Sequence, residues 1–204
     1  MSLVTVVDYG MGNLKSVRNA LENIGAECIE TTSPEEILKA ERLILPGVGA
    51  FGAAMDELDG LGMSDAIREY IKSGRPFFGI CLGQQLLFSA SEESPGAAGL
   101  DCLPGRVVRL CAPGLKVPEV GWNNLWFTQE SPLFYGLESG CYVYFTHSFC
   151  VQAHRPEHVA ARTGYGMQFD SVVQHGKAFA VQFHPEKSGD VGLAILKNFM
   201  NIAE

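Results

Sequence analysis

The segment "PFFGICLGQQLL" (residues 76–87) reads as an apolar strand that turns directly into a helix. At the turn, Gly79 and Gly83 flank Cys81, which is the layout of a nucleophile elbow with cysteine in place of serine. Glycines suit such a tight turn, because a β-carbon there would collide with the neighbouring chain. We expect the Cys81 sulfur to be exposed at the carboxyl edge of a sheet, beside a helix N-terminus that favours the thiolate. The N–H of Leu82 would then be an oxyanion donor. A buried structural cysteine between two packing glycines is the alternative.

The first half of the chain alternates between strand and helix patterns around this segment. Apolar and β-branched runs predict strands at 3–8, 26–30, 42–46 and 76–81. Helices are predicted between and after them, at 13–24, from residue 33, at 50–58, at 64–73 and from residue 82. Asn13 and Ser33 are the expected N-caps of the first two helices. This alternation is typical of a parallel sheet with helices on both faces.

From about residue 104 the pattern changes to short strands separated by glycine and proline. Strands are predicted at 106–110, 115–120, 141–149 and 158–165, then a hairpin at 169–184 that turns at His175–Gly176, and a last helix at 189–202. We therefore predict an α/β fold with an open, mostly parallel or mixed sheet flanked by helices, and a more β-rich C-terminal half. A length of 204 residues fits a single domain spanning 1–204.

The composition indicates a globular protein and argues against nucleic acid or membrane partners. Apolar residues make up 47% and charged residues 19%, and the net charge is −8. An acidic chain is a poor match for phosphate backbones or an anionic membrane surface. No apolar run approaches the length of a membrane span, and the N-terminus lacks the features of a signal peptide. The six cysteines include no C-x-x-C pair, so we expect free thiols and a cytoplasmic protein.

Among the five histidines, His184 is the best candidate for a base that serves Cys81. The segment "QFHPEKSG" (182–189) places His184 at the end of an apolar strand with Glu186 two residues further on. Residues i and i+2 of an extended chain point to the same side, so the carboxylate can orient and stabilise the imidazole. A strand-end histidine beside a solvated acid is the alternative. His147 lies within a strand pattern and is either a core residue or a site residue.

Two further patterns match known motifs only in their letters. The segment "LPGVGAFG" (45–52) contains G-x-G-x-x-G, but it follows the third predicted strand, and Asp65 and Glu69, about 20 residues on, fall within a helix. These facts argue against a dinucleotide site and leave a tight turn as the simple alternative.

The H-x-x-E-H pattern at 154–158 resembles a zinc motif, but Pro156 breaks the helix that the motif requires. We predict a surface turn there and no metal.

The elbow and "QFHPEKSG" together resemble the class I (triad) glutamine amidotransferases, and more narrowly the glutaminase subunits of imidazole glycerol phosphate synthase. The narrower resemblance rests on five segments that follow the family's order and cover essentially the whole chain: "DYGMGNLKSV" (8–17), "LPGVGAFG" (45–52), "GWN" (121–123), "YFTHSF" (144–149) and "QFHPEKSG" (182–189). The resemblance implies a flavodoxin-like fold of the class I amidotransferase type and a reaction that needs no cofactor.

The resemblance also implies roles for individual residues in the hydrolysis of glutamine to glutamate and ammonia through a thioester. Cys81 would be the nucleophile, His184 the general acid and base, and Glu186 the group that orients His184. The oxyanion hole would come from the main chain of Val48, Gly49 and Leu82, with the Val48 N–H presented or flipped into place. The pocket for glutamine would be formed by Gln85, Glu93, His147, Ser148 and Phe149.

By the same resemblance, ammonia passes to a second chain, a cyclase subunit with a (β/α)₈ barrel fold. The heterodimer would make imidazole glycerol phosphate and an aminoimidazole carboxamide ribotide in histidine biosynthesis. The residues expected on the docking face are Pro118, Trp122, Asn123, Tyr144 and Lys187, although Trp122 also suits a core and Lys187 a solvated surface. The sequence departs from the family's usual His, Met, Tyr and Met at Glu119, Val120, Phe149 and Gln84.

Three other functions remain open at the level of sequence. The chain could supply ammonia to another synthase, such as one that amidinates a sugar. It could hydrolyse γ-glutamyl peptides without a partner. It could also be a binding subunit without activity, although the presence of Cys81, His184 and Glu186 together counts against that reading.

Overall fold

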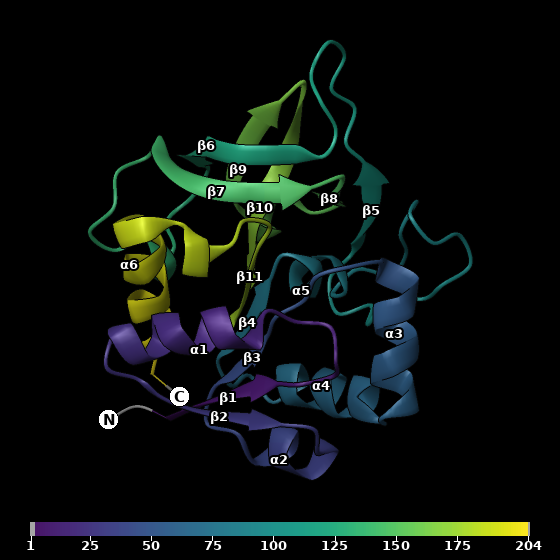
Figure 1. Cartoon of the computed structure of the whole chain (residues 1–204), viewed down its shortest axis with the longest axis vertical. Helices are drawn as coiled ribbons and strands as arrows, with labels where there is room; N and C mark the ends of the chain where they lie inside the picture. Colours follow the sequence, from purple (N-terminus) through teal and green to yellow (C-terminus); the bar gives the residue numbers. More distant parts are fainter. Residues whose placement is uncertain (1–2, 204) are drawn as a thin grey trace.

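The computed structural model describes residues 3–203, in which eleven strands form two sheets (Figure 1). The strands are β1 (Leu3–Val7), β2 (Glu27–Thr31), β3 (Leu43–Leu45), β4 (Phe77–Ile80), β5 (Gly105–Arg109), β6 (Glu119–Phe127), β7 (Cys141–His147), β8 (Phe149–Ala153), β9 (Val159–Tyr165), β10 (Met167–His175) and β11 (Ala178–Val181). The helices are α1 (Leu14–Asn23), α2 (Pro34–Lys39), α3 (Phe51–Gly60), α4 (Met63–Lys72), α5 (Leu82–Gln85) and α6 (Gly189–Met200), with short 3₁₀ helices η1 (Pro132–Phe134), η2 (Pro156–His158) and η3 (Pro185–Lys187). The larger sheet has the order β2-β1-β3-β4-β11-β10-β9-β6-β7, and β5 pairs with β8 in the smaller one.

The N-terminal half of the large sheet is parallel, as its alternation of strand and helix predicts. β1 pairs in parallel with β2 and β3, and β4 pairs in parallel with β3 and β11. Helices α1 and α6 cover one face, and α2, α3 and α4 cover the other (Figure 1). On β4, Phe78 and Ile80 pack into the first core, whereas Phe77 packs into the second. Both faces are buried, which is why these strands read as continuous apolar runs.

The C-terminal half is antiparallel and extends the same sheet. β10 pairs with β9 and β11, β9 pairs with β6, and the hairpin partner β7 forms the edge. In Figure 1 the β6–β7 pair lies at the opposite end of the molecule from β2. The predicted mixed sheet with a β-rich second half is therefore confirmed. Because β11 lies beside β4, residues that follow β11 come close to the end of β4 and its elbow.

Two predicted strands were placed wrongly. The run at 115–120 overlaps β6 only at its end, because β6 continues to Phe127 through a stretch rich in glycine and asparagine that weakens the strand pattern. The run at 141–149 is divided at Ser148, where the chain leaves β7 in the large sheet and enters β8 in the small one. An apolar alternation that continues through such a change of sheet conceals the break.

Some local expectations about helices and turns also need correction. The helix after the elbow covers only Leu82–Gln85. Asn13 and Ser33 occupy the N-cap positions but make no side-chain capping bond; instead, the hydroxyl of Thr31 donates to Glu36 at the start of α2. The turn at 154–158 forms η2, yet His158 within it is buried. Among residues 3–203, no helix is both long enough and apolar enough to cross a bilayer.

Candidate active site

Cys81 stands at the turn between β4 and α5 in a backbone conformation that few non-glycine residues adopt. Its φ is 54° and its ψ is −106°. A β-carbon added to Gly79 would lie 2.7 Å from the Gly83 carbonyl oxygen, and one added to Gly83 would collide with the Leu45 carbonyl oxygen. The flanking glycines are therefore required by close backbone approach, as the sequence predicts. Strain of this kind persists where the surrounding structure holds a functional group in a particular position.

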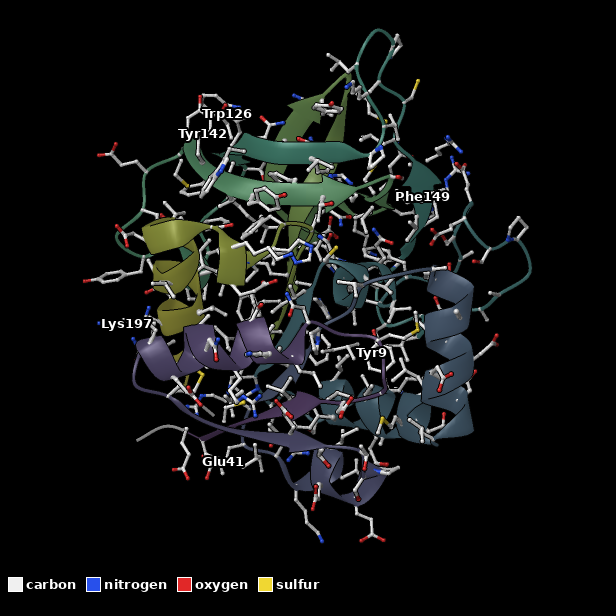
Figure 2. The ribbon with its side chains drawn as sticks, viewed as in Figure 1. Tyr9, Glu41, Trp126, Tyr142, Phe149 and Lys197 are labelled. Atoms are coloured by element: carbon white, nitrogen blue, oxygen red, sulfur yellow. The ribbon has the colours of Figure 1, made fainter. Side chains whose placement is uncertain are left out.

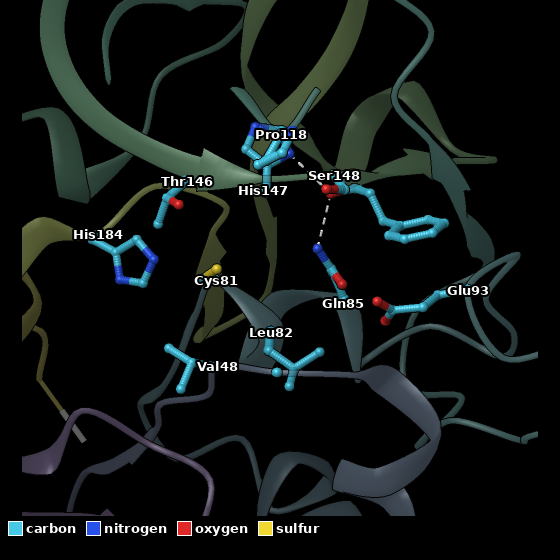
Figure 3. A pocket seen from close by; sticks show the side chains of 12 residues that line it. Val48, Cys81, Leu82, Gln85, Glu93, Pro118, Thr146, His147, Ser148 and His184 are labelled. Atoms are coloured by element: carbon cyan, nitrogen blue, oxygen red, sulfur yellow. Dashed lines mark hydrogen bonds between the residues drawn. The ribbon is translucent and has the colours of Figure 1, made fainter. Parts of the chain in front are cut away.

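The Cys81 sulfur is less exposed than predicted. The residue is only 7% exposed, because it lies on the floor of a cleft of about 300 Å³ rather than on an open sheet edge. Figure 3 shows the sulfur facing into this cleft between the side chains of Val48, His184 and Gln85. The sulfur therefore remains accessible to a small substrate bound in the cleft, despite its low exposure.

His184 and Glu186 form a buried pair on one side of the sulfur. The imidazole Nδ1 lies 2.8 Å from Oε1 of Glu186, and the two side chains are 2% and 1% exposed. The other ring nitrogen, Nε2, has no nitrogen or oxygen partner among residues 3–203 and faces Cys81 (Figure 3). The pairing differs from the predicted extended strand, because Glu186 lies in η3 and the chain turns after His184. Because β11 lies beside β4, the segment that carries His184 and Glu186 comes close to Cys81, although the two are far apart in the sequence.

The environment of His184 favours its protonated form. Burial disfavours the charged ring and lowers its pKa, but interaction with the Cys81 sulfur and with the Glu186 carboxylate outweighs this cost. The pKa of His184 rises to about 10 as a result. A thiolate beside an imidazolium is the arrangement of an activated cysteine nucleophile.

The cleft gathers all but one of the residues that the sequence predicts for catalysis, the oxyanion hole and glutamine binding. It is lined by Val48, Gly49, Cys81, Leu82, Gln85, Glu93, His147, Ser148, Phe149 and His184, together with Pro118 and Thr146. Glu186 lies behind His184 instead. Glu93 has a second structural role, because its Oε2 accepts the Phe51 N–H at the start of α3 at 2.8 Å.

Of the three residues predicted for the oxyanion hole, Val48 and Leu82 have N–H groups that do not point freely into the cleft. The Val48 N–H donates to the Met11 carbonyl oxygen at 3.2 Å, and the Leu82 N–H donates to the Gly47 carbonyl oxygen at 3.4 Å. The Gly47 carbonyl and the Val48 N–H belong to the same peptide unit. One rotation of that unit would therefore release both donors. Gly49, next in the chain, has a φ of 106°, and Val48 is 41% exposed, so little packing opposes such a movement.

Two buried polar residues at the site were not predicted from the sequence. Gln182 is fully buried, and its Nε2 lies 3.6 Å from the Cys81 sulfur. Glu119 is 3% exposed, and its Oε2 lies 3.1 Å from Nε2 of His147, whose Nδ1 donates to the Phe149 carbonyl. A signal for Gln182 was its position two residues before His184. Glu119 was recognised only as a departure from the family pattern.

The outer face of the β6–β7 pair carries aromatic side chains beside the cleft. Trp122 and Tyr144 pair across the two strands with ring centroids 6.2 Å apart, and Trp122 is 55% exposed. Trp126 and Tyr142, which were not predicted, extend this face at its far end (Figure 2). Asn123 lies on the opposite face, where its side chain donates to Glu119 and to the Gly164 carbonyl. The other predicted docking residues, Pro118 and Lys187, are exposed.

The strand–elbow–helix with its cysteine and the buried histidine–glutamate pair define a class of cysteine-dependent amidotransferase. The family described as glutamine amidotransferase class-I matches residues 5–203, and the chain belongs to that family. The chain is 50% identical over 199 residues to a protein of Moorella thermoacetica and 46% identical over 200 residues to one of Methanothermobacter thermautotrophicus. Both are named imidazole glycerol phosphate synthase subunit HisH. The matches cover 98% of this chain in each case, and 94% and 98% of the relatives.

Solved structures support the fold. A structure described as glutamine amidotransferase superposes with a TM-score of 0.76 at 23% identity, covering 97% of this chain and 99% of that one. The PurLQS structure from Thermotoga maritima gives the same TM-score at 20% identity, covering 98% and 97%. At such identities, the likeness concerns the fold alone.

Proposed function

We propose that this chain is the glutaminase subunit of imidazole glycerol phosphate synthase and acts in histidine biosynthesis. It hydrolyses glutamine to glutamate and ammonia and delivers the ammonia to a cyclase subunit. The observation that carries the proposal is the Cys81 sulfur, held at a strained elbow on the floor of a cleft and faced by the buried His184–Glu186 pair. Near-complete coverage of relatives with that name supports the same assignment.

In the first half of the proposed reaction, the Cys81 thiolate attacks the side-chain carbonyl carbon of glutamine. The carbonyl oxygen becomes an oxyanion, and the imidazolium of His184 gives its Nε2 proton to the amide nitrogen. The C–N bond then breaks, and ammonia leaves a γ-glutamyl thioester on Cys81. Glu186 keeps the ring oriented and stabilises its positive charge.

In the second half, His184 acts as a base. The sulfur of the thioester carries no charge, so one of the two groups that raise the pKa of His184 has been neutralised. The neutral ring can take a proton from water, and the hydroxide attacks the thioester carbon. Cleavage of the C–S bond releases glutamate and restores the thiolate beside the imidazolium. The pair thus alternates between acid and base without a metal or cofactor.

The oxyanion hole of the proposed reaction requires the Gly47–Val48 peptide to rotate. In the present arrangement both donors, on Val48 and Leu82, are bound to main-chain carbonyls. Loss of one oxyanion donor typically slows an enzyme by about 10²–10³. We expect partner binding and substrate to favour the rotated peptide, so that little glutamine is hydrolysed when no ammonia acceptor is present.

We place the cyclase subunit, expected to be a (β/α)₈ barrel, on the aromatic face of β6 and β7. This face exposes large apolar side chains and is continuous with the cleft, because Thr146 lines the cleft and pairs with Val120 on β6. Ammonia released at Cys81 would leave beneath such a partner. A cytoplasmic heterodimer that contacts neither nucleic acid nor membrane fits the net charge of −8.

The decisive assay measures glutamate release from glutamine with and without a cyclase subunit of imidazole glycerol phosphate synthase. We expect release to be slow for the chain alone, to rise strongly with the partner, and to vanish in Cys81→Ala. Rapid release without a partner would indicate a stand-alone γ-glutamyl hydrolase. No release under either condition would indicate a binding subunit.

The docking face can be tested separately. Trp122→Ala should weaken binding of the cyclase subunit by about tenfold or more, as expected for a central exposed tryptophan. Tyr135→Ala is the matched control, because Tyr135 is 83% exposed but lies outside the β6–β7 pair. Equal effects of the two changes would argue against the proposed face.

A further inference from the structure

We propose that Gln182 positions the nucleophile: its side-chain amide donates a hydrogen bond to the Cys81 sulfur, and a chain of amides anchored at the Phe149 carbonyl fixes the direction of that donor. This inference rests on the proposed function for its kinetic consequences. Its structural basis, and its main test, concern the sulfur itself and do not depend on which substrate is used.

The orientation of the Gln85 and Gln182 side-chain amides follows from a main-chain carbonyl, which can only accept a hydrogen bond. The Phe149 main-chain carbonyl oxygen lies 3.0 Å from the amide nitrogen of Gln85. Since a carbonyl oxygen has no proton to give, Gln85 must present its NH₂ group at this point. The assignment of oxygen and nitrogen in a buried amide is settled by such contacts. The first amide of the chain is thereby oriented.

The same NH₂ group orients the second amide. The Gln85 nitrogen also lies 3.0 Å from the side-chain oxygen of Gln182. Gln182 must accept there, which turns its own NH₂ group in the opposite direction, toward Cys81. That nitrogen lies 3.6 Å from the sulfur, within the range of an N–H···S hydrogen bond. Reversal of either amide would place two oxygens or two NH₂ groups face to face.

Burial and backbone contacts hold Gln182 in this position. The residue is fully buried, and its main-chain N–H donates to the Ser171 carbonyl at 2.9 Å. It follows β11 directly and precedes His184 by two residues, with the buried Phe183 between them. Two groups from the same short segment therefore contact one sulfur, an amide from Gln182 and an imidazole from His184.

A hydrogen bond from an N–H group to the sulfur stabilises the thiolate more than the neutral thiol. Hydrogen bonds to ionised groups are about twice as strong as those between neutral groups, and burial strengthens them further. The donor at Gln182 stabilises the thiolate and loses most of this interaction when the sulfur is acylated. Its anchor, the Phe149 carbonyl, belongs to the segment predicted to bind the ends of glutamine, so the donor is aligned by the same loop that forms the pocket.

The test is the pH dependence of Cys81 alkylation by iodoacetamide, followed on the Cys81 peptide by mass spectrometry because five other cysteines are present. In Gln182→Met, which keeps the size and removes the donor, the pH of half-maximal alkylation rate should rise by about one unit, the size expected for one charge-assisted hydrogen bond. Gln182→Glu should raise it further, because a carboxylate oxygen then faces the sulfur. Gln85→Met should raise it as well, although the Gln85 amide bonds to Phe149 and Gln182 rather than to the sulfur.

Gln84→Met is the matched control. Gln84 is equally buried and adjacent in sequence, but its amide donates to the Asp170 carbonyl at 3.2 Å. Its alkylation midpoint should equal that of the wild type. In glutaminase assays with the cyclase subunit, Gln182→Met should lower kcat by about 10- to 100-fold while KM changes by less than about threefold.

The proposal is overturned if Gln182→Met, shown to be folded by circular dichroism and thermal unfolding, has the alkylation midpoint of the wild type. It is equally overturned if Gln84→Met shifts the midpoint as much as Gln182→Met, because the effect would then reflect general loosening of the core. Failure of the proposed function would appear differently, as absence of glutamate release in the wild type while the alkylation midpoints of the variants still separate.

Discussion

The two sides of the Cys81 cleft differ in how complete they are. On the side proposed to carry proton transfer, His184 and Glu186 are buried and 2.8 Å apart, and the ring faces the sulfur. On the side predicted to receive the oxyanion, the N–H groups of Val48 and Leu82 are bound to other carbonyls. The proposed nucleophile is thus prepared in advance, whereas the proposed oxyanion hole requires a change in the backbone before it can stabilise a tetrahedral intermediate.

This difference has a physical cause in how each side is packed. The histidine and glutamate lie against the core formed by α1, α6 and their strands, where a displaced charge would be costly. The Gly47–Gly49 segment ends in two exposed residues, and Gly49 has a positive φ that relaxes the backbone. A buried ion pair can change its conformation only at a high energetic cost, whereas an exposed glycine-containing loop can change its conformation at a low cost. We therefore place the control of the proposed reaction on the oxyanion side.

The largest effect on kcat is expected from disrupting the His184–Glu186 side of the cleft. Glu186→Gln keeps the shape but removes the charge that orients and stabilises the imidazolium of His184. We expect kcat for glutamine hydrolysis with the cyclase subunit to fall by about 10³–10⁴. Glu93→Gln, a carboxylate change elsewhere in the same cleft, should lower kcat by less than about tenfold. Similar losses for the two variants would contradict the distinct role given to Glu186.

The second largest effect on kcat is expected on the oxyanion side of the cleft, where the N–H donors are bound to other carbonyls. Val48→Pro deletes the N–H in either orientation of the peptide, so kcat should fall by about 10²–10³. Val48→Ala keeps the N–H and should cost less than about tenfold. Alkylation of Cys81 should remain as fast as in the wild type in both variants, since neither change touches the His184–Glu186 side. A slow alkylation in Val48→Pro would show that the two sides are not independent.

A smaller effect is expected in the pH dependence of stability. The pKa of His184 is raised in the folded state to about 10, above its unfolded value of about 6.5, so the folded protein holds a proton that the unfolded chain releases. This contribution is complete below about pH 6.5 and is lost as pH rises toward 10. Urea unfolding at pH 7 and pH 10 should show the wild type losing roughly 3 kcal/mol more than His184→Gln. Equal losses would mean that His184 is not protonated at neutral pH.

The smallest effect concerns Tyr9, which lies on the oxyanion side against Gly47. Its hydroxyl is buried and has no partner among residues 3–203, and burial raises its pKa. Tyr9→Phe should therefore leave the free energy of unfolding unchanged or raise it by up to about 1 kcal/mol. Tyr70→Phe is the control, because that hydroxyl lies 3.1 Å and 3.0 Å from the carbonyl oxygens of Glu41 and Pro76, which share its proton, and its loss should cost about 1–2 kcal/mol. An equal cost at Tyr9 would reveal a partner, such as the rotated Gly47–Val48 peptide.

The fold could be predicted well where local pattern and tertiary packing agree. β4 and the elbow were recognised because apolar runs, glycines and helix onset follow one another within twelve residues (76–87). β6 and the division between β7 and β8 were not, because the exposed tryptophans of β6 interrupt its alternation and the change of sheet at Ser148 leaves the apolar pattern unbroken. The family resemblance named candidate site residues, most of which line one cleft, but not the buried contacts of Gln182 and Glu119.

By itself, the sequence determined the class of fold, the cysteine elbow and the pairing of His184 with Glu186, because these depend on residues close together in the chain. Only the tertiary structure decided that the sulfur lies at the floor of a cleft, that Gln182 reaches it, and that the Val48 N–H is turned away. The reason is that these contacts join strand ends and loops far apart in sequence, and the direction of a peptide or amide is set by the acceptors that surround it. No local pattern of residues encodes those directions.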